Sequence, residues 1–201
     1  MSLPGQVFKI YREIDYDNIM YLYDYHPWNR NGEKNPHIDQ ITHDILNIKN
    51  PNDEKANYRN KAVRFFKNSL TSHNPPSLLS LIDIQEDRLF AIVPSSTAYR
   101  VCKGMTELVN ELRGPFSFIN EQNILVRHAT VPKAATGGLR DQRVHLNSIR
   151  VDPRLLDGKS VFLFDDVTTT GCSLLACKKL LLDAGAAKVA MIALGQTYME
   201  S

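Results

Sequence analysis

Cysteine is scarce in this sequence. The chain has only Cys102, Cys172 and Cys177, and no CxxC motif is present. These absences exclude a disulfide scaffold and a cysteine-rich zinc site. The six histidines also lack the HExxH motif and other spacings typical of zinc ligands. An odd number of thiols without a secretory signal is typical of a reducing compartment, so we predict a cytoplasmic protein.

Long apolar runs and a strong charge of one sign are missing too. No segment approaches the roughly 18 apolar residues that cross a bilayer, and residues 1–5 contain neither a basic n-region nor an apolar h-region. We therefore expect neither a membrane protein nor a secreted one. The 24 basic and 22 acidic residues give a net charge of +2, which does not by itself indicate a nucleic-acid binder.

What the sequence does contain is the composition of a globular domain. Of its 201 residues, 43% are hydrophobic and 23% are charged, which predicts one domain, at most with an appendage. The apolar periodicity is interrupted at residues 72–77, Ser-His-Asn-Pro-Pro-Ser. We therefore divide the chain into an N-terminal region, residues 1–75, and an α/β core, residues 76–201.

The N-terminal region contains one predicted strand and two predicted helices. Residues 19–25 are rich in β-forming side chains and precede a turn-rich stretch at 29–36. Isoleucines at 38, 41, 45 and 48 recur at helical spacing. A second helix is expected through residues 62–70, with Asp53 and Glu54 near its start, where carboxylates are favourable.

The core region alternates predicted strands with predicted helices. Short buried strands are expected at 89–93, 124–126, 161–164 and 189–194, and helices at 101–112 and 173–184. This alternation predicts an α/β fold with a mainly parallel sheet flanked by helices. Ligands bind beyond the carboxyl ends of such strands, so we expect the chemistry in the loops after Val93, Val126, Phe164 and Leu194.

The most informative segment is residues 161–173. A buried strand is followed by Asp165 and Asp166, and then by small residues that open a helix: Thr168, Thr169, Thr170, Gly171, Cys172 and Ser173. A helix N-terminus offers unpaired N–H groups and a partial positive charge, which suit a phosphate. The carboxylates would repel that phosphate and are better suited to a neighbouring diol or to a hydrated Mg²⁺. The segment therefore predicts a sugar-phosphate site.

A simpler interpretation is that the two aspartates end a strand and that Thr170 caps the next helix. Capping needs one such residue, whereas this turn contains several. It also gives no reason for two adjacent carboxylates beside a buried strand, where desolvation and mutual repulsion are costly. We therefore favour the ligand-binding interpretation.

Residues 161–173, four apolar residues followed by Asp-Asp-Val-Thr-Thr-Thr-Gly-Cys-Ser, resemble the phosphoribosyl pyrophosphate loop of type I phosphoribosyltransferases. Over about residues 88–197 the chain is similar to the ComF-like, competence-protein subgroup of this family. The shorter matches are 93–96 (Val-Pro-Ser-Ser), Tyr99-Arg100, Lys103-Gly104, 124–127 (Ile-Leu-Val-Arg), Gly138-Leu139, Arg143 and Asn147. The N-terminal zinc module usual in ComF-like proteins is absent, because no cysteine precedes Cys102.

The resemblance implies a type I phosphoribosyltransferase fold with a small N-terminal hood-like region. It also implies Mg²⁺-dependent transfer of ribosyl phosphate from phosphoribosyl pyrophosphate to a nitrogenous acceptor, with release of pyrophosphate. On this basis Asp165 and Asp166 are catalytic residues that contact the ribose hydroxyls and Mg²⁺, and residues 168–173 wrap the 5-phosphate. Some family members use an aspartate at the position of Thr169 on a purine base, so the threonine weakens a purine-salvage assignment.

The same resemblance assigns the pyrophosphate to the loop after residue 93. Pro94, Ser95 and Ser96 would face the leaving group, with Arg100 and Lys103 as counter-charges. Both cations could instead lie on the solvated face of the next helix. A long polar stretch, residues 127–149, corresponds to the family's mobile loop over the reacting centre and makes Arg143 a catalytic candidate. A merely solvated loop is the alternative.

Two features of the sequence, the aromatic side chains near residue 25 and the basic residues between 127 and 150, allow more than one interpretation. Aromatic and imidazole side chains near residue 25 could form a hood that selects the acceptor by stacking. These are Tyr21, Tyr23, Tyr25, His26 and Trp28. Alternatively, the tyrosines could pack the core of this region, which is the interpretation that we favour. A protein of this fold could also act without turnover, in nucleotide sensing or in DNA uptake and processing. A basic patch for nucleic acid would then combine Arg127, Lys133, Arg140, Arg143 and Arg150. We also expect a homo-oligomer, whose size the sequence does not specify.

Overall fold

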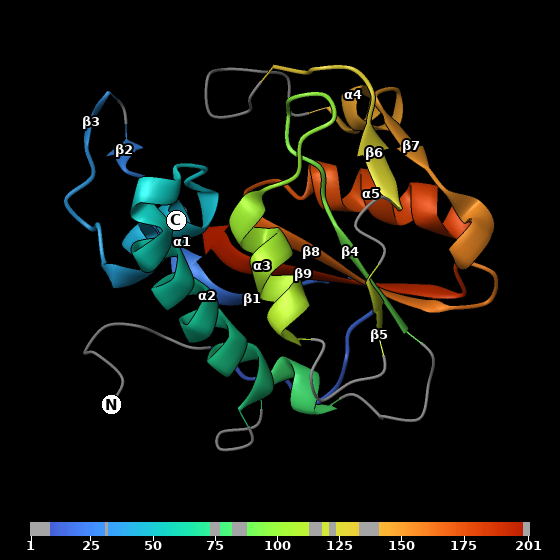
Figure 1. The fold of residues 1–201 in the computed structure, drawn as a ribbon, viewed down its shortest axis with the longest axis horizontal. Helices are drawn as coiled ribbons and strands as arrows, with labels where there is room; N and C mark the ends of the chain where they lie inside the picture. Colours follow the sequence, from blue (N-terminus) through green and yellow to red (C-terminus); the bar gives the residue numbers. More distant parts are fainter. Residues whose placement is uncertain are drawn as a thin grey trace.

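The computed structural model describes residues 9–30, 32–72, 77–81, 88–112, 118–120, 124–132 and 141–198. Its centre is a five-stranded, all-parallel sheet with the order β1-β9-β8-β4-β5 (Figure 1). These strands are β1 (Ile19–Tyr25), β4 (Arg88–Ile92), β5 (Phe118–Asn120), β8 (Ser160–Thr168) and β9 (Lys188–Thr197). The prediction of an α/β fold with a mainly parallel sheet flanked by helices is confirmed.

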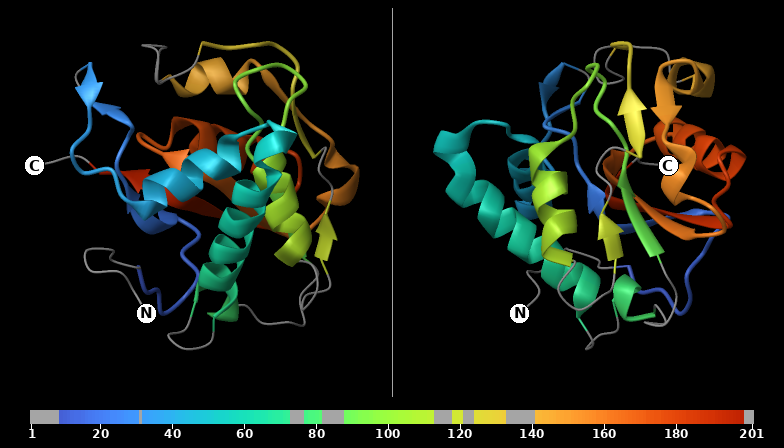
Figure 2. Two further views of the ribbon diagram at one scale, coloured as in Figure 1. Left: turned by 60° about the vertical axis from the view of Figure 1, so that its left-hand side comes forward. Right: turned by 45° about the vertical axis from the view of Figure 1, so that its right-hand side comes forward.

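Helices cover both faces of the sheet (Figure 2). One face carries α1 (Gln40–Lys49), α2 (Ala56–Thr71) and α3 (Lys103–Leu112). The other face carries α5 (Cys172–Asp183), with α4 (Gln142–Leu146) packed on it. None of the helices in the described ranges combines the length and the apolar character that a membrane span requires.

The shorter elements lie between these layers and at the sheet's edge. An antiparallel pair, β6 (Leu125–Arg127) and β7 (Ile149–Val151), packs on the α5 face. A small hairpin, β2 (Asn29–Arg30) and β3 (Glu33–Lys34), follows the carboxyl end of β1. Single 3-10 turns occur at η1 (Asp53–Lys55), η2 (Leu78–Leu81) and η4 (Pro153–Leu155).

The continuous apolar runs of β4 and β8 explain why the sheet is buried on both sides. Side chains alternate between the faces of a strand, so Phe90, Phe162 and Phe164 belong to the cluster beneath α1–α3. Their rings meet edge to face, with centroids 6.1 and 5.3 Å apart. The intervening residues, such as Leu163, join the cluster beneath α5. Two-sided burial of this kind is typical of a central parallel strand.

The N-terminal region is part of the same core. β1 pairs in parallel with β9, with Ile19 opposite Met191 and Tyr25 opposite Thr197. α1 and α2 share one hydrophobic cluster with α3 and with the sheet strands. The division expected at residue 75 therefore does not separate two hydrophobic cores, because the apolar sides of α1 and α2 are buried against the sheet. Residues 73–76, where we expected the boundary, are not among the described residues.

Two strands differ from the sequence-based expectation. The strand expected at 124–126 exists as β6, but it pairs antiparallel with β7 instead of joining the central sheet. β8 does not end at residue 164, because its pairing with β9 continues to Thr168 opposite Gln196. The acidic pair therefore lies inside a strand and not in the loop that follows it.

The start of α3 lies unusually close to the end of α1. A Cβ atom added at Gly104 would overlap the carbonyl oxygen of Ile48 and lie 2.9 Å from its Cα. Next to it, Cys102 Sγ donates to the same Ile48 carbonyl at 3.3 Å. A side chain at position 104 would therefore force the two helices apart.

We predict that Gly104→Ala lowers the free energy of unfolding by about 1–3 kcal/mol, the usual cost of overpacking. Alanine is otherwise the better residue in a helix, so the sign of the change is diagnostic. Asn60→Ala, at an exposed position of α2, is the matched control and should not be destabilised. Chemical denaturation measures both variants, and a Gly104→Ala protein as stable as the wild type would contradict the close approach.

Candidate functional site

Asp165 and Asp166 are directed to opposite faces of the sheet. Asp165 Oδ1 accepts the backbone N–H of Asp166 at 2.9 Å, and its Oδ2 accepts the hydroxyl of Ser173, in the first turn of α5, at 3.3 Å. On the other face, Asp166 Oδ1 lies 3.0 Å from Nζ of Lys49, the last residue of α1. Two carboxyl groups that bind one ion together would lie on the same face of the sheet. The structure does not place Asp165 and Asp166 in this way.

The two carboxyl groups also differ in charge compensation. Burial raises the pKa of Asp165 far above its usual range, and the nearby Asp166 charge raises it further. Among the described residues, none forms a salt bridge with Asp165. Burial alone would lower the pKa of Lys49, but its ion pair and hydrogen bond with Asp166 raise it overall. Asp166 thus has a cationic partner at ion-pair distance, whereas Asp165 favours its protonated form.

The turn between β8 and α5 leaves the start of the helix without a side-chain cap. The N-cap residue is Gly171, with φ +77° and no side chain to accept the first amides. The interpretation of Thr170 as the cap is therefore wrong; its hydroxyl donates to Cys172 Sγ at 3.3 Å. Such a helix start is suited to an external anion.

Hydroxyl groups surround this helix start. Thr169 Oγ1 lies 2.8 Å from Thr197 Oγ1, which ties the turn to the end of β9. Thr168 is only 5% exposed and pairs with Gln196 as the last residue of β8. The open part of the predicted phosphate loop is therefore residues 169–173. A Cβ at Gly171 would lie 2.5 Å from Ile19 Cδ1, so glycine is required there.

A buried arginine, Arg127, anchors the loop that follows β4. Arg127 is 1% exposed, and its Nε donates to the carbonyl of Ser95 at 2.6 Å, with Nη2 at 3.5 Å from the carbonyl of Pro94. The carbonyl of Arg127 in turn accepts the N–H of Tyr99 at 2.8 Å. Tyr99 is exposed and has a φ of +57°, which non-glycine residues rarely adopt. Arg127 therefore holds the start of this loop and, through its carbonyl, Tyr99 farther along it.

Arg127 is satisfied by neutral groups. Its Nη1 donates to Ser148 Oγ, and Nη2 lies 3.2 Å from His145 Nδ1. Burial lowers the pKa of Arg127, and burial together with this guanidinium lowers the pKa of His145. Because Arg127 is buried, it does not contribute to the surface patch considered for nucleic acid. Two other members of that patch, Lys133 and Arg140, lie outside the described residues.

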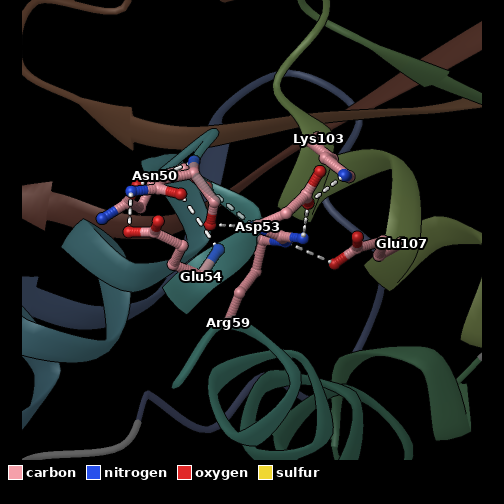
Figure 3. Close-up of polar contacts among 7 residues, drawn as sticks. Asn50, Asp53, Glu54, Arg59, Lys103 and Glu107 are labelled. Carbon is pink, nitrogen blue, oxygen red and sulfur yellow. Dashed lines mark hydrogen bonds and ion pairs between the residues drawn. The ribbon is translucent and has the colours of Figure 1, made fainter. Parts of the chain in front are cut away.

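Three predicted site cations are placed away from the acidic pair. Lys103 forms an ion pair with Asp53 of η1, in a network that also contains the buried Arg59 and Glu107 of α3 (Figure 3). Arg143 is 84% exposed in α4 and lies 2.9 Å from Asp141. Arg100 is exposed, and its backbone closes the turn with Thr97 and Ser95. Among the described residues, none of these three side chains forms an ion pair or a hydrogen bond with Asp165 or Asp166.

The tyrosines expected near the acceptor belong to the core, as we favoured. Tyr23 and Tyr25 are 8% and 9% exposed and lie in the cluster beneath α1–α3. His26 and Trp28 follow β1 and are more open. The His26 ring lies 5.2 Å from that of Tyr198, just beyond the end of β9. This pair, and not the tyrosines of β1, is the aromatic surface beside the carboxyl edge.

The donor set suits Mg²⁺ only together with ligand oxygens. Within the described ranges, no group of three or more His, Cys, Asp or Glu side chains could hold a metal ion. Mg²⁺ commonly needs only one or two carboxylates when phosphates and waters complete its shell. Asp165 is the carboxyl group that lacks a cation, so it is the side chain of the pair that fits this role.

Sequence reasoning missed Lys49 and the role of Arg127. Lys49 carries no motif and lies in the region that matches the family only vaguely. Its single sequence signal is its place at the end of an amphipathic helix, which many surface lysines share. Arg127 is part of a matched segment, but its burial depends on the packing of β6 against the β4–α3 loop. Neither contact follows from local sequence.

We predict that Asp165→Asn stabilises the protein at pH 8. The raised pKa means that the native state keeps a proton that the unfolded state loses, so stability falls as pH rises from the unfolded pKa towards the native one. Asparagine keeps an acceptor for Ser173 and cannot ionise. The expected gain is about 1–3 kcal/mol at pH 8 and none near pH 4, measured by urea denaturation across this range. If the free energy of unfolding changed with pH in the same way in the wild type and in Asp165→Asn, the prediction would be contradicted.

We also predict that Arg127→Met loosens the β4–α3 loop. It leaves the carbonyls of Pro94 and Ser95 without donors, so the free energy of unfolding should fall by about 2–4 kcal/mol. Amide hydrogen exchange at Tyr99 should accelerate. Arg150→Met, the same substitution at an exposed position of β7, should change stability by less than about 0.5 kcal/mol. Equal effects of the two substitutions would refute the anchoring role.

A comparison with protein-family models finds none that matches this chain, and a comparison with curated proteins finds no matching sequence. The resemblance to phosphoribosyltransferases therefore depends on the short sequence matches alone, above all on the 161–173 segment.

Proposed function

We propose that this protein is a Mg²⁺-dependent, ComF-like phosphoribosyltransferase. It would bind phosphoribosyl pyrophosphate and transfer the ribosyl phosphate to a small nitrogenous acceptor, releasing pyrophosphate. One observation carries the proposal: the uncapped start of α5, the acidic pair and the Arg127-anchored loop lie at the carboxyl ends of the neighbouring strands β8 and β4. Ligands of open parallel sheets bind at this edge.

The ribosyl phosphate half would occupy the β8–α5 turn. The amides at the start of α5 and the hydroxyls of Thr169, Thr170 and Ser173 are donors for the 5-phosphate. Asp166, paired with Lys49, would accept hydrogen bonds from the ribose hydroxyls. These contacts fix the position of the sugar carbon that reacts.

The pyrophosphate half would lie over the β4–α3 loop. The chain there would supply the hydroxyls of Ser95 and Ser96, on a loop whose carbonyls at Pro94 and Ser95 are held by Arg127. Mg²⁺, held by Asp165 and by the ligand's own oxygens, would neutralise the leaving pyrophosphate. Whether Arg143 closes over this half stays a prediction, because residues 133–140, which precede α4, lie outside the described residues.

The chemistry asked of the protein is mainly positioning. The bond between ribose C1 and the pyrophosphate oxygen breaks, and pyrophosphate leaves with the bonding electrons. A bond forms between C1 and the acceptor nitrogen, which releases a proton to solvent. The acceptor would approach beside the ends of β1 and β9, where His26 and Tyr198 lie. Holding both reactants in line and excluding water accounts for the catalysis.

We predict that Thr170→Glu weakens phosphoribosyl pyrophosphate binding by at least about 100-fold, because a carboxylate would face the phosphate at the start of α5. Asn57→Glu, which adds the same charge at an exposed position of α2, should bind like the wild type. Isothermal titration with Mg²⁺ present measures both. The proposal fails if the wild type does not bind, or if Thr170→Glu binds normally.

Pyrophosphate release across a panel of bases and amines tests turnover itself. Release with one acceptor class establishes the transferase and identifies its substrate. Tight binding without release from any acceptor would instead favour nucleotide sensing. Salt-sensitive binding of single-stranded DNA, unaffected by Thr170→Glu, would favour the DNA-processing alternative.

A further inference from the structure

Lys49 reaches the acidic pair from outside every matched motif. It is the last residue of α1, and its Nζ lies 3.0 Å from Asp166 Oδ1. The Tyr25 ring lies on the same side, with its centroid 6.0 Å from the ammonium group. The Asp166 side chain is 19% exposed and the Lys49 side chain 39%, so the pair is shielded from solvent mainly on the Asp166 side. Shielding of this kind strengthens an ion pair.

The backbone on either side of Lys49 is fastened. The carbonyl of Ile48 accepts from Cys102 Sγ at 3.3 Å and lies against Gly104. The carbonyl of Asn50 accepts from Arg59 Nη1 at 3.1 Å. Arg59 is itself 2% exposed and bound to Asp53 and Glu107 (Figure 3). The backbone from which the Lys49 side chain extends towards Asp166 is therefore fixed in place.

Lys49 forms its ion pair with Asp166 and acts on Asp165 only through space. The lysine lies on the α1 face with Asp166, whereas Asp165 is bonded to Ser173 on the α5 face. A divalent cation bound at Asp166 would lie within a few ångströms of the ammonium group, and the two positive charges would repel each other. A divalent cation at Asp165 would displace no ion pair, because among the described residues Asp165 forms none.

We propose that Lys49 is a positioning residue that replaces a metal ion at Asp166. It holds this carboxylate ready for the ribose hydroxyls, so the protein binds the ribose phosphate half of its ligand without a divalent cation. Mg²⁺ is then required only for the pyrophosphate half. This inference rests on the proposed function and adds to it which half of the ligand depends on the metal.

Ribose 5-phosphate, which lacks the pyrophosphate, is the probe that separates the two halves. Isothermal titration of the wild type should give affinities that differ by less than about twofold between Mg²⁺ and EDTA. Lys49→Met should bind about tenfold more weakly in EDTA, the effect of losing one charge-assisted contact, and should regain affinity with Mg²⁺. Lys49→Arg should keep the metal independence of the wild type.

Controls distinguish this role from a structural one. Lys67→Met removes an ion pair of similar length, 2.9 Å to Glu111 on the helices away from the site, and should bind ribose 5-phosphate like the wild type. If Lys49→Met does not fold, as judged by thermal unfolding, Lys49→Gln replaces it with a polar side chain of similar length and the same expected result.

The inference is overturned if the wild type requires Mg²⁺ for ribose 5-phosphate, does not bind it, or binds it no better than Lys49→Met in EDTA. Each of these outcomes leaves the proposed function intact when phosphoribosyl pyrophosphate still binds with Mg²⁺. Failure of the wild type to bind phosphoribosyl pyrophosphate at all would end both proposals.

Discussion

Side chains alternate between the two faces of a parallel sheet, and in β8 this alternation continues from the apolar core into the acidic pair. Residues 161–164 pack in turn against α5 and against α1–α3. Because β8 stays paired with β9 as far as Thr168, Asp165 and Asp166 follow the same rule. One carboxyl group meets the start of α5 and the other meets the end of α1, and each therefore has its own partners.

Charge is buried here at a cost to stability that a ligand can offset. Asp165 has neutral hydrogen-bond partners, and the guanidinium of Arg127 is held by carbonyl, hydroxyl and imidazole groups. Desolvated charges without a counter-ion destabilise a fold, which is why they gather where function requires them. Only Asp166 has a full counter-charge, in Lys49. Charge is therefore distributed unevenly along the carboxyl edge of the sheet before any ligand binds.

Local sequence predicted most of the elements but few of their partners. Apolar runs and helical spacing identify β1, β4, α3 and α5, because those signals come from the burial of neighbouring residues. The pairing of β1 with β9, and of β6 with β7 outside the sheet, depends on contacts between distant segments. The same limit applies to the site. The motif identifies Asp165 and Asp166, but not that Lys49 pairs with one of them or that Lys103 is held by Asp53.

β1 and β9 are distant in the sequence but adjacent in the sheet, so the sheet can form in full only after both strands have been synthesised. β1 precedes β9 by most of the described sequence, and β9 is its only described neighbour in the sheet. Until β9 is available, β1 has no strand to join, and the apolar sides of α1 and α2 lack part of their cover. Such long-range pairing slows folding and exposes the growing chain to aggregation. Lys49 of α1 and Asp166 of β8 are likewise distant in sequence, so their ion pair also forms through long-range packing.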